Sequence, residues 1–135
     1  DSVRLSENHA MDAGGAVFAI ARSVVECYGD VSVRFNSATV KGGAFFLQTS
    51  TLYTEGAAEI AENSASELGG GVQAILSSTV ELGGGTSVRA NHAGLHGGGV
   101  YVEEHSWLFA WESIVTLNGA GGNGGGVFAA VRAYV

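Results

Sequence analysis

Apolar and polar residues are arranged along the chain in a pattern that returns every 27 or 28 residues. Two columns of this pattern are wholly apolar. They consist of Val17, Phe45, Val72, Val100 and Val127, and of Ala19, Leu47, Ala74, Val102 and Ala129. Polar residues such as Gln73, Gln48 and Glu103 occur only in the columns between and after these two. Polar residues confined to one parity are typical of a β-strand with one buried face, so each repeat is predicted to contain such a strand.

The same repeat carries a motif of one Asn, one Ala and a pair of Gly residues. The five asparagines are Asn8, Asn36, Asn63, Asn91 and Asn118. The alanines that follow two positions later are Ala10, Ala38, Ala65, Ala93 and Ala120. The first glycines of the pairs, six positions after each Asn, are Gly14, Gly42, Gly69, Gly97 and Gly124. A fixed period of this length indicates a repeat architecture in which each unit needs its neighbours to bury its apolar face.

Two further strands complete each repeat. One follows the Gly-pair strand, and the residues that we expect to face inward are Val25, Leu52, Val80 and Trp107, with Cys27, Thr54, Leu82 and Phe109 two positions later. The other runs into the Asn and carries the aliphatic column Leu5, Val33, Ile60, Val88 and Val115. We expect the difference between 27 and 28 residues to be absorbed between the Gly-pair strand and the second strand.

Three short strands per repeat predict an all-β fold, a right-handed parallel β-helix of about five coils that occupies residues 1–135 as a single domain. Residues 57–68 could form a helix locally. However, they occupy the same columns as residues 31–41, whose Val and Thr residues disfavour a helix, so a strand is predicted in both. The strands of the first and last coils are incomplete, which predicts a segment of a longer solenoid or a subunit that stacks on neighbours.

The motif residues are predicted to have structural roles. Asn tolerates the left-handed backbone region at a corner, and its amide can bond to the asparagines of adjacent coils, which predicts a ladder along the solenoid axis. The Ala must be small where the wall turns. The Gly pair allows positive φ or a close approach of two backbones.

The motifs also resemble the repeats of chlamydial polymorphic outer membrane proteins, which are also found in large surface proteins of some algae and protists. The family's Gly-Gly-Ala-aliphatic motif corresponds to Gly14-Gly15-Ala16-Val17 and Gly42-Gly43-Ala44-Phe45, whereas the other three copies have Gly in place of Ala. The Phe of the family's Phe-x-x-Asn motif is replaced by an aliphatic residue in every copy. The resemblance implies a β-helical passenger region and a role as a surface adhesin.

Composition and charge exclude several functions. The net charge is −7 and the single lysine is Lys41, so no basic stripe is available for nucleic acid or for an anionic membrane surface. Charged or polar residues interrupt the apolar stretches, so no segment is predicted to cross a membrane. Cys27 is the only cysteine, which excludes an intrachain disulfide. The chain begins at Asp1 without an initiator Met or a signal sequence, which predicts a mature or trimmed segment.

The column between the two apolar columns of the Gly-pair strand is the candidate contact strip. Its members are Phe18, Phe46, Gln73, Tyr101 and Phe128. If it is exposed, an apolar strip of roughly 20 Å is typical of a partner surface, and aromatic rings can also stack on sugars. The alternatives are that a neighbouring domain or chain covers the strip, or that the parity is inverted and the strip is core.

The other candidate groups do not form a reactive site. His9, His92 and His96 have no converging Asp or Cys, so we expect neither a metal nor a cofactor. Glu26 and Glu81 share an outward column two coils apart, about 10 Å, which is too far for a retaining pair of a glycosidase and marginal for an inverting pair. Trp107 is expected in the core, whereas corner residue Trp111 either packs locally or is exposed and adhesive.

These observations predict a non-catalytic structural or adhesive solenoid of an extracellular or cell-surface protein, which works as part of a fibre, as a spacer or as a contact module. Its partners would be further coils, other copies of itself, a partner protein or surface glycans. The alternative is a β-helix that binds or cleaves polysaccharides.

Overall fold

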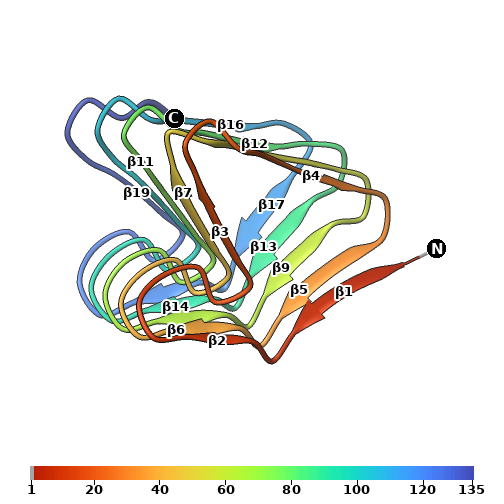
Figure 1. Ribbon diagram of the computed structural model, residues 1–135, viewed down its shortest axis with the longest axis horizontal. Helices are drawn as coiled ribbons and strands as arrows, with labels where there is room; N and C mark the ends of the chain where they lie inside the picture. The colour runs from red at the N-terminus through yellow and green to blue at the C-terminus, as the bar shows by residue number, and fades with distance from the viewer. Residues whose placement is uncertain (1) are drawn as a thin grey trace.

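The computed structural model describes residues 2–135, and it is a solenoid of stacked parallel coils (Figure 1). The described residues contain only strands, turns and bends, and four parallel sheets form the walls. The prediction of an all-β solenoid of about five coils is therefore confirmed. The sequence predicted three strands per coil, but the structure has a fourth strand of two residues that contains the repeated Ala.

Each sheet contains the equivalent strands of successive coils. The first sheet, which leads into the Asn, contains β1 (Val3–Ser6), β5 (Val31–Arg34), β9 (Glu59–Ala61), β13 (Ser87–Arg89) and β17 (Ile114–Thr116). The second contains β2 (His9–Ala10), β6 (Ser37–Ala38), β10 (Ser64–Ala65), β14 (His92–Ala93) and β18 (Gly119–Ala120). The third, which follows the Gly pair, contains β3 (Val17–Ile20), β7 (Phe45–Gln48), β11 (Val72–Ile75), β15 (Val100–Val102) and β19 (Val127–Ala129). The fourth contains β4 (Val24–Tyr28), β8 (Thr51–Glu55), β12 (Thr79–Leu82) and β16 (Trp107–Ala110).

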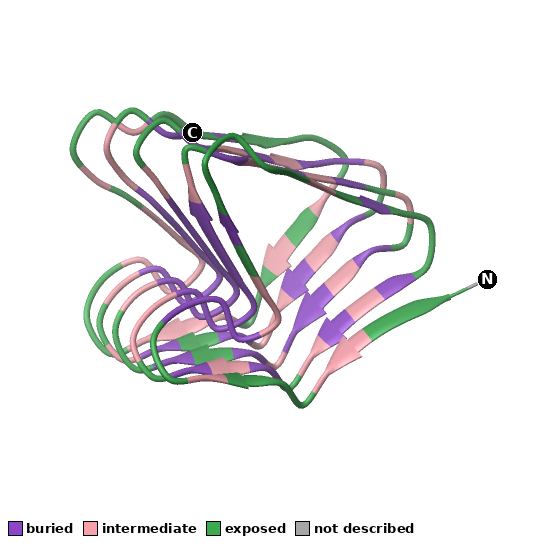
Figure 2. Cartoon of the chain, viewed as in Figure 1, coloured by how far each residue is buried: buried purple, intermediate pink, exposed green. Residues whose placement is uncertain are grey.

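The sheets pair column by column, as the sequence repeat requires. Val72 of β11, for example, is aligned with Phe45 of β7 and with Val100 of β15. The two apolar columns of the third sheet point into the solenoid, and Leu47 and Val72 are fully buried there. Burial increases toward the middle coils, where each residue has a coil on either side (Figure 2). The core is therefore a stack of like apolar residues that runs along the axis.

The corner before the two-residue strand is made by the residue that precedes each Asn. These residues have φ between 52° and 59°, and they are Glu7, Phe35, Glu62, Ala90 and Leu117. Asparagine itself is not in the left-handed region in any coil, so that part of the prediction is wrong. The preceding residue makes the turn, and this leaves the backbone N–H and the side chain of the Asn directed along the solenoid axis.

The five asparagines form the predicted ladder. In the second coil, the backbone N–H of Asn36 donates to Oδ1 of Asn63 at 2.9 Å, and its Nδ2 donates to the same oxygen at 3.0 Å. The Nδ2 group also donates to the carbonyl oxygen of Leu5 in the previous coil at 2.9 Å. The same bonds recur at Asn63 and Asn91. Each of these side chains thus satisfies a backbone N–H and a backbone carbonyl group of the preceding coil at a buried corner, and donates to the next asparagine side chain.

The two glycines of each pair have different roles. The first has φ between 60° and 68° in all five coils, which places it in the left-handed region. The second has no positive φ, but a Cβ at Gly43 would overlap the carbonyl oxygen of Gly70 in the next coil. Both reasons for Gly, positive φ and close backbone approach, are therefore present, one at each member of the pair.

The fourth coil corrects the register predicted for the second strand. Leu108 pairs with Val80 and Ala110 pairs with Leu82, so these two residues point inward in β16. Trp107 and Phe109 are exposed, and their assignment to the core is wrong. The repeat from Asn91 to Asn118 has 27 residues and not 28, and the missing residue lies at the corner after β16, not before the strand. Counting backward from Asn118 therefore shifts the register of β16 by one position. The second coil is also one residue shorter at one point, and there the missing residue lies before β8, as predicted.

A column of serines forms a second ladder, at the turn between the third and fourth sheets. The backbone N–H of Ser23 donates to Oγ of Ser50, that of Ser50 donates to Oγ of Ser78, and that of Ser78 donates to Oγ of Ser106, at 3.1–3.2 Å. Counting forward from this column places Leu108, like Val80 and Leu52, two residues after its serine. The serines were therefore the signal that could have given the correct register.

We predict that replacing Asn63 by Ala removes a large part of the stability. The backbone N–H of Asn36 and the carbonyl oxygen of Val33 would lose buried partners, and each such loss costs about 1–3 kcal/mol. The free energy of unfolding, measured by urea denaturation with circular dichroism, should fall by roughly 2–4 kcal/mol. The control is Asn8→Ala, in an exposed position, which should cost less than about 1 kcal/mol. Equal effects of the two substitutions would contradict the ladder's role.

We also predict that Gly43→Ala is far more damaging than Gly29→Ala. The methyl group added at Gly43 would overlap backbone atoms of Gly70 and Ser64, which no side-chain movement can relieve, at a cost of about 3 kcal/mol or more. Gly29 has φ +71° but open space around it, so Ala there should cost only about 1 kcal/mol. Thermal unfolding of the two variants distinguishes steric overlap from backbone conformation. A larger loss at Gly29 would show that positive φ, not the stacking distance, dominates.

Candidate functional site

The candidate contact strip on the third sheet is mostly buried. Phe46, Gln73 and Tyr101 expose only 5%, 1% and 5% of their surface, whereas Phe18 in the first coil exposes 53%. Phe128 in the last coil is half-buried. The strip does point away from the solenoid core, as expected, but the expectation that it is exposed is wrong for its three middle residues.

The loops that carry the Gly pairs account for this burial. Each loop leaves the two-residue strand, turns back and packs against the outer side of the third sheet (Figure 1). A Cβ at Gly97 would lie 2.7 Å from Cβ of Tyr101, and one at Gly124 would lie 2.7 Å from Cβ of Phe128. The loop residue His96 stacks on Phe128 with 4.7 Å between ring centroids. The positive φ of the first Gly thus lets the chain cover the strip.

The strip residues contact one another along the axis. Phe18 stacks on Phe46 at 5.0 Å, and Tyr101 stacks on Phe128 at 5.4 Å. Gln73 is aligned between Phe46 and Tyr101. Burial and a 2.7 Å hydrogen bond from the Tyr101 hydroxyl to Glu103 raise the pKa of this tyrosine. Such stacking and burial make the strip a second packing layer, not a contact surface.

Most of the exposed aromatic side chains lie on the outer face of the fourth sheet. We call this surface the aromatic–acidic face and define it by Tyr28, Tyr53, Trp107, Phe109, Trp111, Tyr134, Glu26, Glu55 and Glu81. Five of the six aromatic residues expose between 41% and 57% of their surface, and Tyr53 is half-buried. Sequence reasoning missed this face because it placed Trp107 and Phe109 in the core.

The aromatic rings of this face contact one another from coil to coil. Trp107 stacks on Tyr134 at 4.1 Å and lies 5.7 Å from the parallel ring of Phe109. Trp111 occupies the column of Gly83, where a Cβ would lie 2.5 Å from the indole ring, so the glycine makes room for the tryptophan. The ring of Tyr53 is tilted against Trp111 at 6.4 Å. The ring contacts therefore form two groups on the same sheet, one of Tyr28, Tyr53 and Trp111 and one of Trp107, Phe109 and Tyr134.

Tyrosines and glutamates alternate on the N-terminal half of the face. Glu26 is aligned with Tyr53, and Tyr28 is aligned with Glu55. The Tyr53 hydroxyl donates to Oε2 of Glu55 at 2.8 Å, and the Tyr28 hydroxyl donates to Oε1 of Glu26 at 3.2 Å. The hydrogen bond to Glu55 is the main reason that the pKa of Tyr53 is raised to about 12. Each of these hydroxyls holds one carboxylate oxygen of its glutamate and leaves the other free.

The column of carboxylates that the sequence predicts is present on the fourth sheet. Glu26 and Glu81 do share one outward column, with Tyr53 between them. Two rungs separate the two carboxylates, about 10 Å. Among residues 2–135 no group of three or more His, Cys, Asp or Glu side chains is placed to hold a metal ion. His9 bonds to Ser37 at 2.8 Å, and His96 accepts from the N–H of Asn123 at 3.0 Å, so the histidines do not converge.

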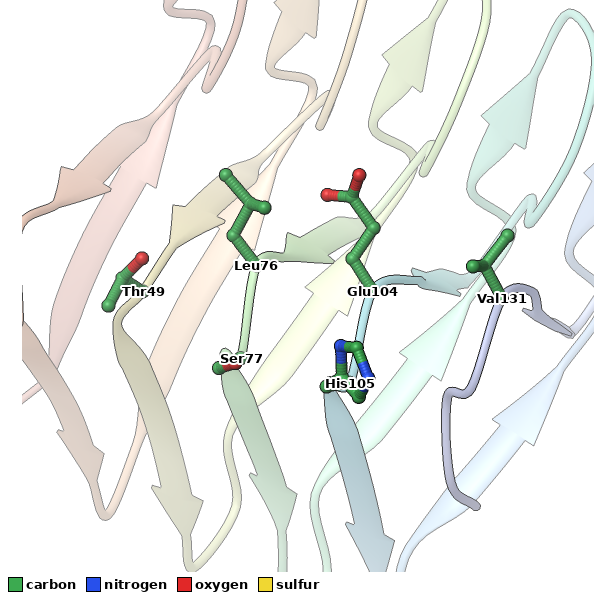
Figure 3. A pocket seen from close by; sticks show the side chains of 6 residues that line it. All are labelled: Thr49, Leu76, Ser77, Glu104, His105 and Val131. Atoms are coloured by element: carbon green, nitrogen blue, oxygen red, sulfur yellow. The ribbon is translucent and has the colours of Figure 1, made fainter.

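Two shallow hollows lie outside the aromatic–acidic face. One, of about 420 Å³, follows the turn between the third and fourth sheets and is lined by Thr49, Leu76, Ser77, Glu104, His105 and Val131. Leu76, Glu104 and Val131 come from equivalent turn positions of successive coils and project the same way (Figure 3). All six residues have positive φ. Because positive φ recurs at this turn in every coil, this backbone conformation is a general property of the turn and does not indicate strain at one functional site.

The second hollow, of about 470 Å³, lies over the two-residue strands and includes His9, Ser37, Ser64 and His92. Apart from the two histidines, it is lined by small side chains, and it contains no Phe, Tyr or Trp. Neither hollow combines exposed aromatic rings with several carboxylates, as the fourth sheet does.

Comparisons of the chain with family models, with curated proteins and with solved structures gave no significant match. In the described part of the chain there is also no helix of the length and apolarity needed to cross a membrane. The site must therefore be interpreted from its own geometry.

We predict that the ionisation of Tyr53 depends on Glu55. The neutral phenol is the form that donates to the carboxylate, so the bond stabilises the fold below pH 10 and is lost as the pH rises from about 10 toward 12. Absorbance titration should show one tyrosinate step near pH 12 that disappears in Tyr53→Phe. In Glu55→Gln the step should move down toward pH 10. The control is Glu7→Gln, at a distant corner, and a shift of the same size there would contradict the pairing.

Proposed function

We propose that this chain is a non-catalytic contact module, a β-solenoid that presents the aromatic–acidic face to a partner. The observation that carries the proposal is the exposure of five large aromatic side chains on one sheet of the solenoid. Exposed apolar patches on soluble proteins are typical of interaction sites, and Trp and Tyr are the side chains that most often dominate binding energy.

The rigidity of the wall supports the proposal. The strands of the fourth sheet are in register from β4 to β16, so the side chains of the face have fixed spacing in both directions. Contact groups held on regular strands are positioned more sharply than groups on loops. The Asn and Ser ladders on either side of the core hold the coils in this register.

The other walls are less suited to a partner. The outer side of the third sheet is covered by the glycine loops, and the second sheet presents short polar residues such as Ser37 and Ser64. On the first sheet, Arg34 and Arg89 pair with Glu59. Within residues 2–135, the fourth sheet is the wall on which carboxylates without an ion pair and exposed rings occur together.

We place the module in an extracellular or cell-surface protein, as an adhesive or structural element. The resemblance of its repeats to those of surface adhesins supports this location. The uniform direction of the asparagine ladder supports extension of the stack head to tail by further coils, either of the same chain or of another copy.

The proposal is tested by removing the rings without disturbing the strand. Trp107→Thr restores the residue that Thr51 and Thr79 provide in the same column, and Phe109→Thr keeps a good strand former. The chain, immobilised on beads, is screened against arrays of proteins and of glycans. We expect saturable binding to at least one class of target, and a loss of at least about tenfold in affinity in the Trp107→Thr/Phe109→Thr variant.

The matched control removes two exposed aromatic residues elsewhere, in Phe18→Thr/Phe35→Asn, with Asn at position 35 because the backbone there has φ 57°. This variant should bind as the parent chain does. An array without any saturable target would overturn the proposal, as would a control variant that loses as much affinity as the first.

A further inference from the structure

We propose that the partner of the aromatic–acidic face is a basic protein segment, whose arginine side chains pair with Glu26, Glu55 and Glu81 and lie against the neighbouring rings. This inference depends on the proposed function, because it names the class of partner that binds to the same face. It is based on the charge of the face, on an arrangement within the chain that already holds an arginine, and on the geometry of the tyrosine–glutamate pairs.

The charge of the face is uniform. The strands β4, β8, β12 and β16 contain three glutamates and neither Lys nor Arg. In the described part of the chain, the ion pairs join only Arg34 and Arg89 to Glu59 and Glu62, so none reaches the carboxylates of the face. The face therefore carries uncompensated negative charge beside exposed aromatic rings, and its electrostatic complement is a cationic surface.

The first sheet shows how this chain accommodates an arginine. Arg34 pairs with Glu59 at 3.6 Å and with Glu62, and its guanidinium carbon lies 5.2 Å from the ring centroid of Phe35. Two carboxylates and one aromatic ring thus hold one guanidinium. On the fourth sheet, Glu26 and Glu81 flank Tyr53, and Glu81 is also aligned with Phe109. The fourth sheet thus also places carboxylates beside aromatic rings, and within residues 2–135 no arginine forms an ion pair with them.

The tyrosine hydroxyls prepare the carboxylates for such a partner. Glu55 accepts from Tyr53 through Oε2, and Glu26 accepts from Tyr28 through Oε1. The second oxygen of each carboxylate has no side-chain hydrogen bond within residues 2–135. Restricting a glutamate rotamer before binding lowers the entropy lost on association. Each held carboxylate is therefore a fixed acceptor beside a ring.

Arginine fits this set of groups better than the other classes of ligand. Its guanidinium donates to carboxylates and stacks on aromatic rings at the same time, whereas an ammonium group is a point charge without a flat face. Anionic glycans and nucleic acids would be repelled by the three carboxylates. A neutral glycan would use the rings but would gain nothing from the charge of the glutamates, so it predicts a binding strength that is independent of salt.

The test uses the intrinsic fluorescence of the chain. Both tryptophans, Trp107 and Trp111, lie on the aromatic–acidic face, so the signal reports directly on binding there. The intact chain is titrated with short alternating peptides, Arg–Ser, Lys–Ser and Glu–Ser, and with a neutral cello-oligosaccharide. We expect saturable binding of the Arg–Ser peptide, weaker binding of Lys–Ser and none of Glu–Ser. The affinity for Arg–Ser should fall at least about tenfold when salt is raised from about 0.02 M to about 0.5 M.

The variant that separates a specific site from general charge is Glu26→Gln/Glu81→Gln. It keeps the shape of the face and removes two charges. Removing two exposed ion pairs should weaken Arg–Ser binding roughly three- to tenfold. The matched control is Glu7→Gln/Glu67→Gln, which changes the net charge equally at exposed positions outside the fourth sheet and should bind within a factor of about two of the parent chain.

Three results would overturn the inference. The first is equal weakening in the two double variants, which would show only long-range attraction. The second is binding of Glu–Ser as strong as that of Arg–Ser. The third is saturable binding of the neutral oligosaccharide while the basic peptides produce no change; this result would leave the contact function of the face intact and replace its partner by a glycan. Failure of the contact function itself would instead appear as an array without any target that depends on Trp107 and Phe109.

Discussion

The hydrogen bond from one asparagine to the next, repeated along the solenoid, is the interaction on which the structure depends. Every coil must turn a sharp corner between the first sheet and the two-residue strand, and the backbone groups at such a corner are buried by the coils on either side. Asn36, Asn63 and Asn91 are almost completely buried, and each receives and donates along the axis. Because an unpaired buried amide is costly, the corner fixes the register of the first, second and third sheets, and the serine ladder fixes that of the fourth.

The glycine pair acts on the outside of the wall and in this way determines which surface remains available. The first Gly lets the loop turn back over the third sheet, and the second lets successive loops stack at the spacing of the strands. As a result, Phe46 and Tyr101 become interior side chains although they point away from the core. No comparable loop covers the fourth sheet in the described part of the chain. Exposure of the aromatic–acidic face is thus a consequence of backbone geometry elsewhere in the repeat.

The sequence predicted the parts of the fold that recur at fixed spacing. The period, the inward columns of the third sheet, the asparagine ladder and the two roles of the glycines all follow from residues that are the same, or nearly so, in five copies. A pattern repeated five times averages out local exceptions. The errors lie where a single copy differs. The fourth coil drops one residue at the corner near Trp111, and a period-2 strand that is shifted by one position exchanges its two faces completely.

Burial of the strip could not be predicted from strand periodicity, because alternation distinguishes only the two sides of a sheet. Whether the outer side of the third sheet is exposed to solvent depends on the path of the loop that precedes it. That path depends on the positive φ of the first Gly of each pair. The left-handed residue before each Asn was missed for a related reason. Glu7, Phe35, Glu62, Ala90 and Leu117 share no chemical property, so the turn is imposed on them by the ladder that follows.

A solenoid of this kind separates the choice of surface residues from the stability of the fold. The ladders and the inward columns use the same few positions in every coil, which leaves the outer columns free to vary. On the first sheet, the outer positions hold arginines that form ion pairs with Glu59. On the fourth sheet, they hold aromatic rings and glutamates, and the strands of that sheet contain no Lys or Arg to balance the negative charge. Uncompensated charge on an outer column contributes little to stability because it is solvated. Its electrostatic energy becomes appreciable only where a group of opposite charge displaces that solvent, and this is the physical basis of the proposed contact with a cationic partner.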